Sequence, residues 1–179
     1  MKFYKILFAS LMLAGCSALS ATTPLNYYNY METALSFKNY NERTHTAQLK
    51  EFLLLDPTRV EWCAAFINAV LEENNIDSLN TPDASQCSQC EQGKMHPYPL
   101  AARSFLHWGM EVTGPPQYGD IVVFPRGSNT FNGHAGFYMG SVYINNKHYY
   151  QILGGNQNKQ VSLKNFRANR ALGIRRPIR

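Results

Sequence analysis

A cysteine, a histidine and an asparagine, far apart along the chain, have the side chains that thiol-based acyl chemistry requires: Cys63, His134 and Asn156. A cysteine attacks a carbonyl carbon as its thiolate, a histidine takes the thiol proton, and a third polar group holds the imidazole. Cys63 falls near the first turn of an expected helix over 60–74, where the helix dipole lowers a thiol pKa. The sequence therefore predicts Cys63 as nucleophile, His134 as base and Asn156 as orienting residue.

The positions of the second and third residues suit these roles. His134 begins an expected strand directly after a glycine-rich loop, and Asn156 ends the next long strand within Gly154–Gln157. Each residue also has a structural interpretation, which the sequence leaves open. Cys63 is alternatively a small buried side chain, His134 a packing residue, and Asn156 a turn residue in the left-handed conformation.

The elements that must position these residues follow from hydrophobic periodicity. Helical spacing predicts helices over 46–55, 60–74 and 100–108, and the first of these stops at Asp56-Pro57 because proline disfavours a preceding helical residue. Short apolar runs predict strands over 119–124, 134–140, 142–144, 148–153, 161–163 and 172–176, with Asn145-Asn146 as a hairpin turn. Helices followed by an antiparallel sheet indicate an α+β fold in one domain.

The first residues predict export from the cytoplasm. Basic residues in 1–5 precede an apolar stretch, Ile6–Leu13, that is too short to span a bilayer. Leu13–Cys16 resembles a bacterial lipobox, which implies a lipid on Cys16 and an outer-membrane anchor facing the periplasm; the alternative is an ordinary signal peptide cut near Ala18 or Ala21. We therefore expect a signal peptide over 1–15, a lipidated tether over 16–38 and a folded domain over 39–179.

The overall charge of the chain does not indicate a nucleic-acid partner. The chain carries a net charge of +5, which falls to +3 without Lys2 and Lys5 of the leader. Basic residues gather near the C-terminus, where we interpret them as solvated charges: Arg167, Arg170, Arg175, Arg176 and Arg179. No basic stripe with interleaved aromatic residues accompanies them, so a nucleic-acid partner is not expected.

Five sequence blocks resemble one bacterial and phage family in order and spacing, the NlpC-type and CHAP cysteine peptidases: Trp62–Asn68, Leu100–Phe105, Gly119–Phe124, Gly133–Tyr138 and Leu153–Gln157. The resemblance covers roughly residues 40 to 177. It implies a papain-like fold and cleavage of a peptide or amide bond in peptidoglycan. The matching positions imply Cys63 as nucleophile, His134 as base and Asn156 as orienting residue, with no metal or cofactor.

The chain departs from this family in a longer connection that contains Cys87 and Cys90. In an oxidising compartment a local disulfide between them is the first expectation. A metal site with His96 and one further ligand, or a redox-active pair, remains open, although a single C-x-x-C pair is a weak signal for either.

Two other functions also stay open at this point. One keeps the fold and transfers an acyl group to an acceptor other than water. The other is a non-catalytic envelope lipoprotein that binds peptidoglycan or a partner. In each case we expect a monomer whose contacts with the envelope are peptidoglycan and the lipid anchor.

Overall fold

The structure is a computed structural model and describes residues 29–79, 100–128 and 132–178. Helices come first in the chain: α1 (Asn29–Ser36), α2 (Thr46–Leu53), α3 (Cys63–Glu73) and the 3₁₀ helix η2 (Ala102–His107). Strands follow, with one further 3₁₀ helix: β1 (Met110–Glu111), β2 (Ile121–Pro125), β3 (Gly133–Ile144), β4 (Lys147–Gly154), β5 (Ser162–Arg167), η3 (Ala168–Arg170) and β6 (Gly173–Arg176). The predicted α+β class is confirmed.

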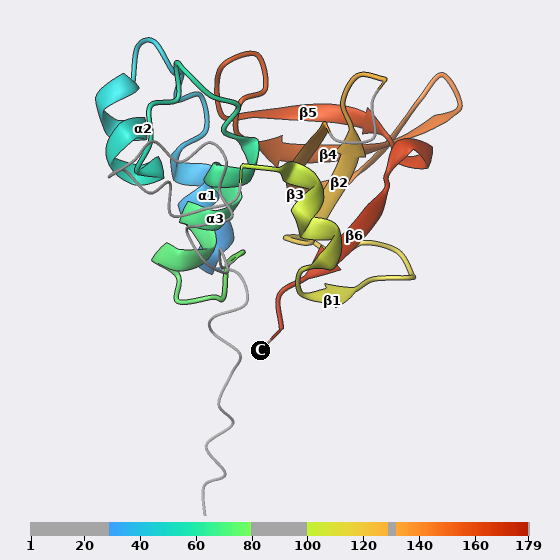
Figure 1. Cartoon of the computed structure of the whole chain (residues 1–179). Coiled ribbons are helices and arrows are strands. Elements are labelled where there is room, and N and C mark those ends of the chain that lie inside the picture. Colours follow the sequence, from blue (N-terminus) through green and yellow to red (C-terminus); the bar gives the residue numbers. More distant parts are fainter. Residues whose placement is uncertain (1–28, 80–99, 129–131, 179) are drawn as a thin grey trace, which may run out of the picture.

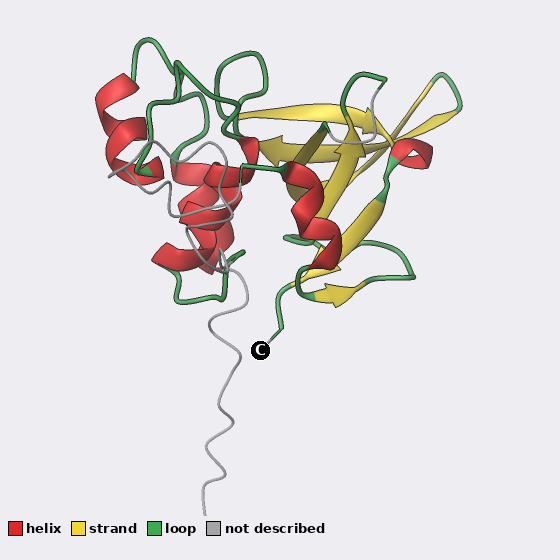
Figure 2. Cartoon of the chain, viewed as in Figure 1, coloured by secondary structure: helices red, strands yellow, loops and turns green. Residues whose placement is uncertain are grey.

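The six strands form one sheet in the order β1-β6-β2-β3-β4-β5, and every pair is antiparallel. The helices α1, α2 and α3 gather on one side of this sheet, as Figure 1 and Figure 2 show. The short helix η2 packs against β2, β3 and β6. The chain therefore divides into a helical half, residues 29–79, and a sheet half, residues 100–178.

The β3–β4 hairpin confirms the predicted turn. Asn145 and Asn146 have φ angles of 49° and 58°, the left-handed conformation that a type I′ turn requires at both central residues. The register pairs Tyr143 with His148 beside the turn and shifts by one position near Gly140. This turn fixes which residues of β3 and β4 face the helices.

The core lies between α3 and the sheet. The side chains of α3 from Cys63 to Leu71 are buried on all sides, because α1 and α2 cover the helix surface that the sheet does not. Phe66 is central: its ring lies 6.4 Å from that of Phe137 on β3 and 6.2 Å from that of Phe52 on α2. Burying one such ring contributes roughly 2–3 kcal/mol. This packing holds the start of α3 against β3.

The first helix corrects the predicted domain boundary. Residues 16–38 were expected to form a tether, but Tyr30, Met31 and Ala34 of α1 are buried in the core. The Tyr30 ring lies 5.8 Å from that of Phe137. The folded domain therefore includes residues 29–38, because α1 supplies one wall of the core around α3.

An ion pair attaches the last strand to the sheet. Asp120, just before β2, is fully buried and accepts two hydrogen bonds of 2.7 Å from the Arg176 guanidinium on β6. Asp120 also accepts a hydrogen bond of 2.7 Å from the backbone N–H of Gln117. The buried carboxylate is thus satisfied on both oxygens.

Among the helices in the described part of the chain, none is long and apolar enough to cross a membrane.

Candidate functional site

Cys63 is the first residue of α3, close to its predicted place. The helix begins three residues later than expected, because Trp62 has a non-helical ψ of 15° and serves as the N-cap. The earliest helical hydrogen bond runs from the N–H of Phe66 to the carbonyl of Trp62, so the amide groups before Phe66 lie in the unpaired first turn. Backbone hydrogen bonds from Ala135 on β3 and from Ala64 reach the thiol. The structure therefore brings Cys63 to the residue after His134.

A glycine makes this approach of α3 to the sheet possible. A Cβ atom on Gly155, just after β4, would lie 2.6 Å from the Trp62 ring and 2.7 Å from the Cβ of Phe66. Real Cβ atoms do not come so close, so only glycine lets the end of β4 pack on the start of α3. Trp62 is held from the other side by a hydrogen bond of 3.2 Å from its indole N–H to Glu42.

His134 lies on β3 with only 7% of its surface exposed. Its ring stacks on that of Phe166, at 5.2 Å and 16°. Its Nε2 atom is buried and has no hydrogen-bond partner. An unpaired buried nitrogen is uncommon, because desolvating such a group without a partner costs about 1–3 kcal/mol. The imidazole is therefore fixed by packing on Phe166 and keeps an unused polar atom.

Gln157 is a residue that the sequence reasoning missed. Its side chain is almost fully buried, and its Nε2 donates to the carbonyls of Ile152, Gly154 and Ser162 at 3.2, 3.1 and 2.7 Å. Its Oε1 is buried without a partner. A Cβ on Gly154 would lie 2.8 Å from the Gln157 Nε2 and 3.3 Å from the His134 Nε2. The His134 Nε2 and the Gln157 amide thus flank the same glycine, and the unpaired Nε2 and Oε1 have complementary hydrogen-bonding capacity.

Asn156 does not have the predicted contact. Its φ of 56° is the left-handed turn conformation, and its side-chain amide donates to Glu61. No hydrogen bond joins Asn156 to His134, two residues within the described part of the chain. The left-handed turn sends the Asn156 side chain outward to the surface and the next side chain, that of Gln157, inward.

Three charged or polar side chains meet near this site. Glu61, two residues before α3, is 64% exposed and accepts hydrogen bonds from both Arg126 and Asn156. Arg126 follows β2 directly, and its charge acts on both the thiol and the imidazole. The Glu61 carboxylate, before α3, therefore connects to the segment after β2 and to the segment after β4.

The ionisation of the two candidate catalytic groups differs from the sequence-based expectation. Burial raises the pKa of the Cys63 thiol, and the hydrogen bond from Ala135 and the charge of Arg126 offset only part of this effect. Burial, followed by the charges of Arg126 and Lys164, lowers the pKa of His134 to about 4. The expected low thiol pKa is thus wrong for this buried cysteine: the thiol and the imidazole are both neutral at pH 7.

Three other predicted residues, Cys16, Cys87 and Cys90, lie outside the described residues. Within 29–79, 100–128 and 132–178, no three His, Cys, Asp or Glu side chains are grouped so that they could hold a metal ion.

Comparisons with known proteins return no match: no protein-family model matches the chain, and no curated protein or solved structure is significantly similar to it.

Proposed function

We propose that the protein is a thiol-dependent hydrolase of the bacterial envelope with a papain-like fold, which cleaves a peptide or amide bond in peptidoglycan. The observation that carries the proposal is the meeting of Cys63, at the unpaired start of α3, with the beginning of β3, where His134 keeps a neutral and incompletely paired imidazole. A nucleophile, a base and free backbone amides are the parts that acyl transfer needs.

The unpaired atoms assign a role to each imidazole nitrogen. The Nε2 of His134 and the side-chain amide of Gln157 both lie near Gly154, so we propose that Nε2 carries the ring proton and that the Gln157 amide orients the ring. This leaves Nδ1 as the base. Gln157 suits the positioning role because three backbone carbonyls hold its amide in place.

The reaction proceeds by proton transfer followed by nucleophilic attack. Nδ1 of His134 takes the proton of the Cys63 thiol as sulfur bonds to the carbonyl carbon of the substrate. The imidazolium then protonates the leaving amine as the carbon–nitrogen bond breaks, which leaves a thioester on Cys63. Water, deprotonated by the same imidazole, releases the acid. The free amides at the start of α3 stabilise the oxyanion, and each such donor contributes roughly 3 kcal/mol.

The charge of the sheet half supports an anionic substrate. Residues 100–178 contain nine lysines and arginines but only two acidic residues, Glu111 and Asp120. Arg126 lies close enough to act on Cys63 and His134 and is held by Glu61. The stem peptides of peptidoglycan carry free carboxylates, which basic side chains at an entrance attract.

Digestion of purified sacculi tests the proposal. Wild-type protein should release new muropeptides, which mass spectrometry identifies, whereas Cys63→Ala and His134→Ala should lower the rate by about 10⁴-fold or more. Glu111→Gln, on β1 and remote from the thiol, serves as the control and should act as wild type. Fragments identical to those of untreated sacculi, or full activity of Cys63→Ala, would exclude the proposed thiol hydrolase. Products that carry a new acyl group would assign the site to acyl transfer instead.

A further inference from the structure

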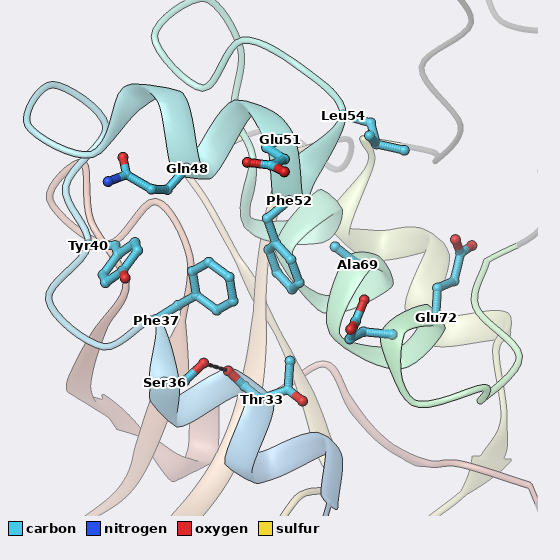
Figure 3. A pocket seen from close by; sticks show the side chains of 11 residues that line it. Thr33, Ser36, Phe37, Tyr40, Gln48, Glu51, Phe52, Leu54, Ala69 and Glu72 are labelled. Atoms are coloured by element: carbon cyan, nitrogen blue, oxygen red, sulfur yellow. Dashed lines mark hydrogen bonds between the residues drawn. The ribbon is translucent and has the colours of Figure 1, made fainter.

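The helical half contains a groove of about 780 Å³. Figure 3 shows it between α1, α2 and α3. Residues from these three helices and from the loop after α1 line it: Thr33, Ser36, Phe37, Tyr40, Gln48, Glu51, Phe52, Leu54, Ala69, Glu72 and Glu73. A volume of this size is in the range that accommodates organic ligands and short peptide segments.

The floor of the groove is aromatic. Phe37 and Phe52 stack with ring centroids 4.0 Å apart, and Tyr40 meets Phe37 edge-on at 5.1 Å. Figure 3 shows the two phenylalanine rings at the centre, with Tyr40 to one side and Leu54 at the rim. Leu54 is 60% exposed. An apolar side chain that enters the groove would therefore contact aromatic faces and cover an exposed leucine.

The electrostatics of the groove favour a cation. Glu51, Glu72 and Glu73 line it, and none of the lining residues within the described chain is basic. The lining also includes the last turns of α1, α2 and α3, where backbone carbonyls make the helix end negative. Glutamates in the last turn of α3 repel the negative end of the helix dipole. A positive charge bound beside them would reduce this repulsion.

The two halves of the molecule have opposite charge. Residues 29–79 contain eight acidic and four basic side chains, whereas residues 100–178 contain two acidic and nine basic ones. The groove lies entirely in the acidic half, although the chain as a whole is basic. Charge complementarity therefore selects a basic occupant for the groove, different from the anionic substrate that the sheet half favours.

We propose that this groove is a docking site for a basic peptide segment of a partner protein, which inserts one apolar side chain against Phe37 and Phe52 and places lysine or arginine beside Glu51 and Glu73. An occupant of the groove would not cover the Cys63 end of α3, because Cys63 and Glu73 are the first and last residues of this 11-residue helix and are separated by about 15 Å.

Synthetic peptides test this docking site. The probe is acetyl-Lys-Lys-Trp-Lys-Lys-amide, titrated into the purified protein by calorimetry at 50 and 300 mM NaCl. We expect saturable binding that weakens severalfold at the higher salt. Peptides with alanine in place of tryptophan, or with glutamate in place of lysine, separate the apolar from the charged contribution, and each should bind at least tenfold more weakly.

Matched variants locate the binding. Glu73→Gln should raise Kd about threefold and the Glu51→Gln, Glu73→Gln pair about tenfold, whereas Glu111→Gln on β1 changes the net charge equally and should leave Kd unchanged. Leu54→Asn removes an apolar side chain from the rim and should also weaken binding. Asparagine adopts the left-handed φ of 53° at this position, so the backbone at the end of α2 is not strained. Ile178→Asn, which removes another exposed apolar side chain far from the groove in the sequence, is its control.

Five results would overturn the proposal, four of them in the full-length chain. These are no binding of the tryptophan peptide at 1 mM, equal binding of the acidic peptide, equal effects of Glu73→Gln and Glu111→Gln, or concentration-dependent self-association that Glu73→Gln abolishes. The last result would assign the groove to a second copy of the chain. Binding that appears only after removal of residues 17–28 would assign the groove to that segment and equally contradict a partner.

Discussion

At its first residue α3 carries a thiol that is 2% exposed, whereas its last turn carries two exposed glutamates, Glu72 and Glu73. The sheet packs on the first end because Gly155 lets β4 approach Trp62 and Phe66. At the other end α1 and α2 leave a groove. The two ends of one helix therefore differ in solvation: the first end is desolvated and lies beside unpaired polar atoms, and the last end is exposed and charged.

The largest expected effect concerns the pH dependence of stability at the buried end. Burial lowers the pKa of His134 from 6.5 to about 4. Between these two pH values His134 is therefore protonated in the unfolded chain but neutral in the folded chain. The folded state therefore keeps its full stability above pH 6.5 and loses on the order of 3 kcal/mol as the pH falls towards 4.

Urea denaturation at pH 7.5 and pH 4 measures this loss. Wild type should lose about 3 kcal/mol more than His134→Gln between the two pH values. Glu73→Gln, at the exposed end of α3, should show the wild-type difference. Equal losses of unfolding free energy for wild type and His134→Gln would show that the folded protein does not hold the imidazole neutral. The Cys63 end of α3 would then not be more desolvated than the Glu73 end.

The second effect concerns the packing of the end of β4 on the start of α3, which excludes water from the Cys63 end of the helix. Gly155→Ala places a methyl group against Trp62 and Phe66, which should lower the free energy of unfolding by about 2 kcal/mol through overpacking. Gly114→Ala is the matched control, because no atom lies within 4 Å of the position of its Cβ. Iodoacetamide labelling of Cys63, located by peptide mass mapping, should accelerate in Gly155→Ala. Unchanged stability and labelling would contradict the close approach of β4 to α3.

The third effect separates two neighbouring amides. Gln157→Glu places a carboxylate beside the imidazole, which should raise the pKa of His134 and move the acid limb of kcat/KM up by about one pH unit or more. Asn156→Asp makes the same chemical change at the outward position and should move this limb by less than about 0.3 units. If Asn156→Asp shifts the limb more than Gln157→Glu does, the orienting residue is Asn156, as first predicted from sequence.

The smallest expected effect is on the free energy of unfolding, when a carboxylate is removed from one end of α3 or from the other. A negative charge is favourable near a helix start and unfavourable in its last turn, by about 0.3–1 kcal/mol. Glu61→Gln should therefore lower the free energy of unfolding by about 0.5 kcal/mol, and Glu73→Gln should raise it by about 0.3 kcal/mol. Thermal denaturation at low ionic strength measures both. Changes of the same sign would show that local contacts, and not the helix dipole, govern these carboxylates.

Much of the fold follows from local patterns in the sequence. The helix that begins at Cys63, the strand that contains His134 and the Asn145-Asn146 turn all depend on periodicity or turn chemistry within a few residues. The α1 helix was missed as part of the domain. Its buried residues, Tyr30 and Met31, stand among polar neighbours and become core only because α3 packs on them.

The chemistry of the site depends on contacts that no local pattern contains. Asn156 and Gln157 carry the same functional group, and only the φ of 56° at Asn156 decides which amide turns inward. The helix position of Cys63 predicts a low thiol pKa, yet burial of the thiol raises it. The sequence by itself determined the residue types and their elements. The tertiary structure decided orientation and desolvation, because both are set by atoms distant along the chain.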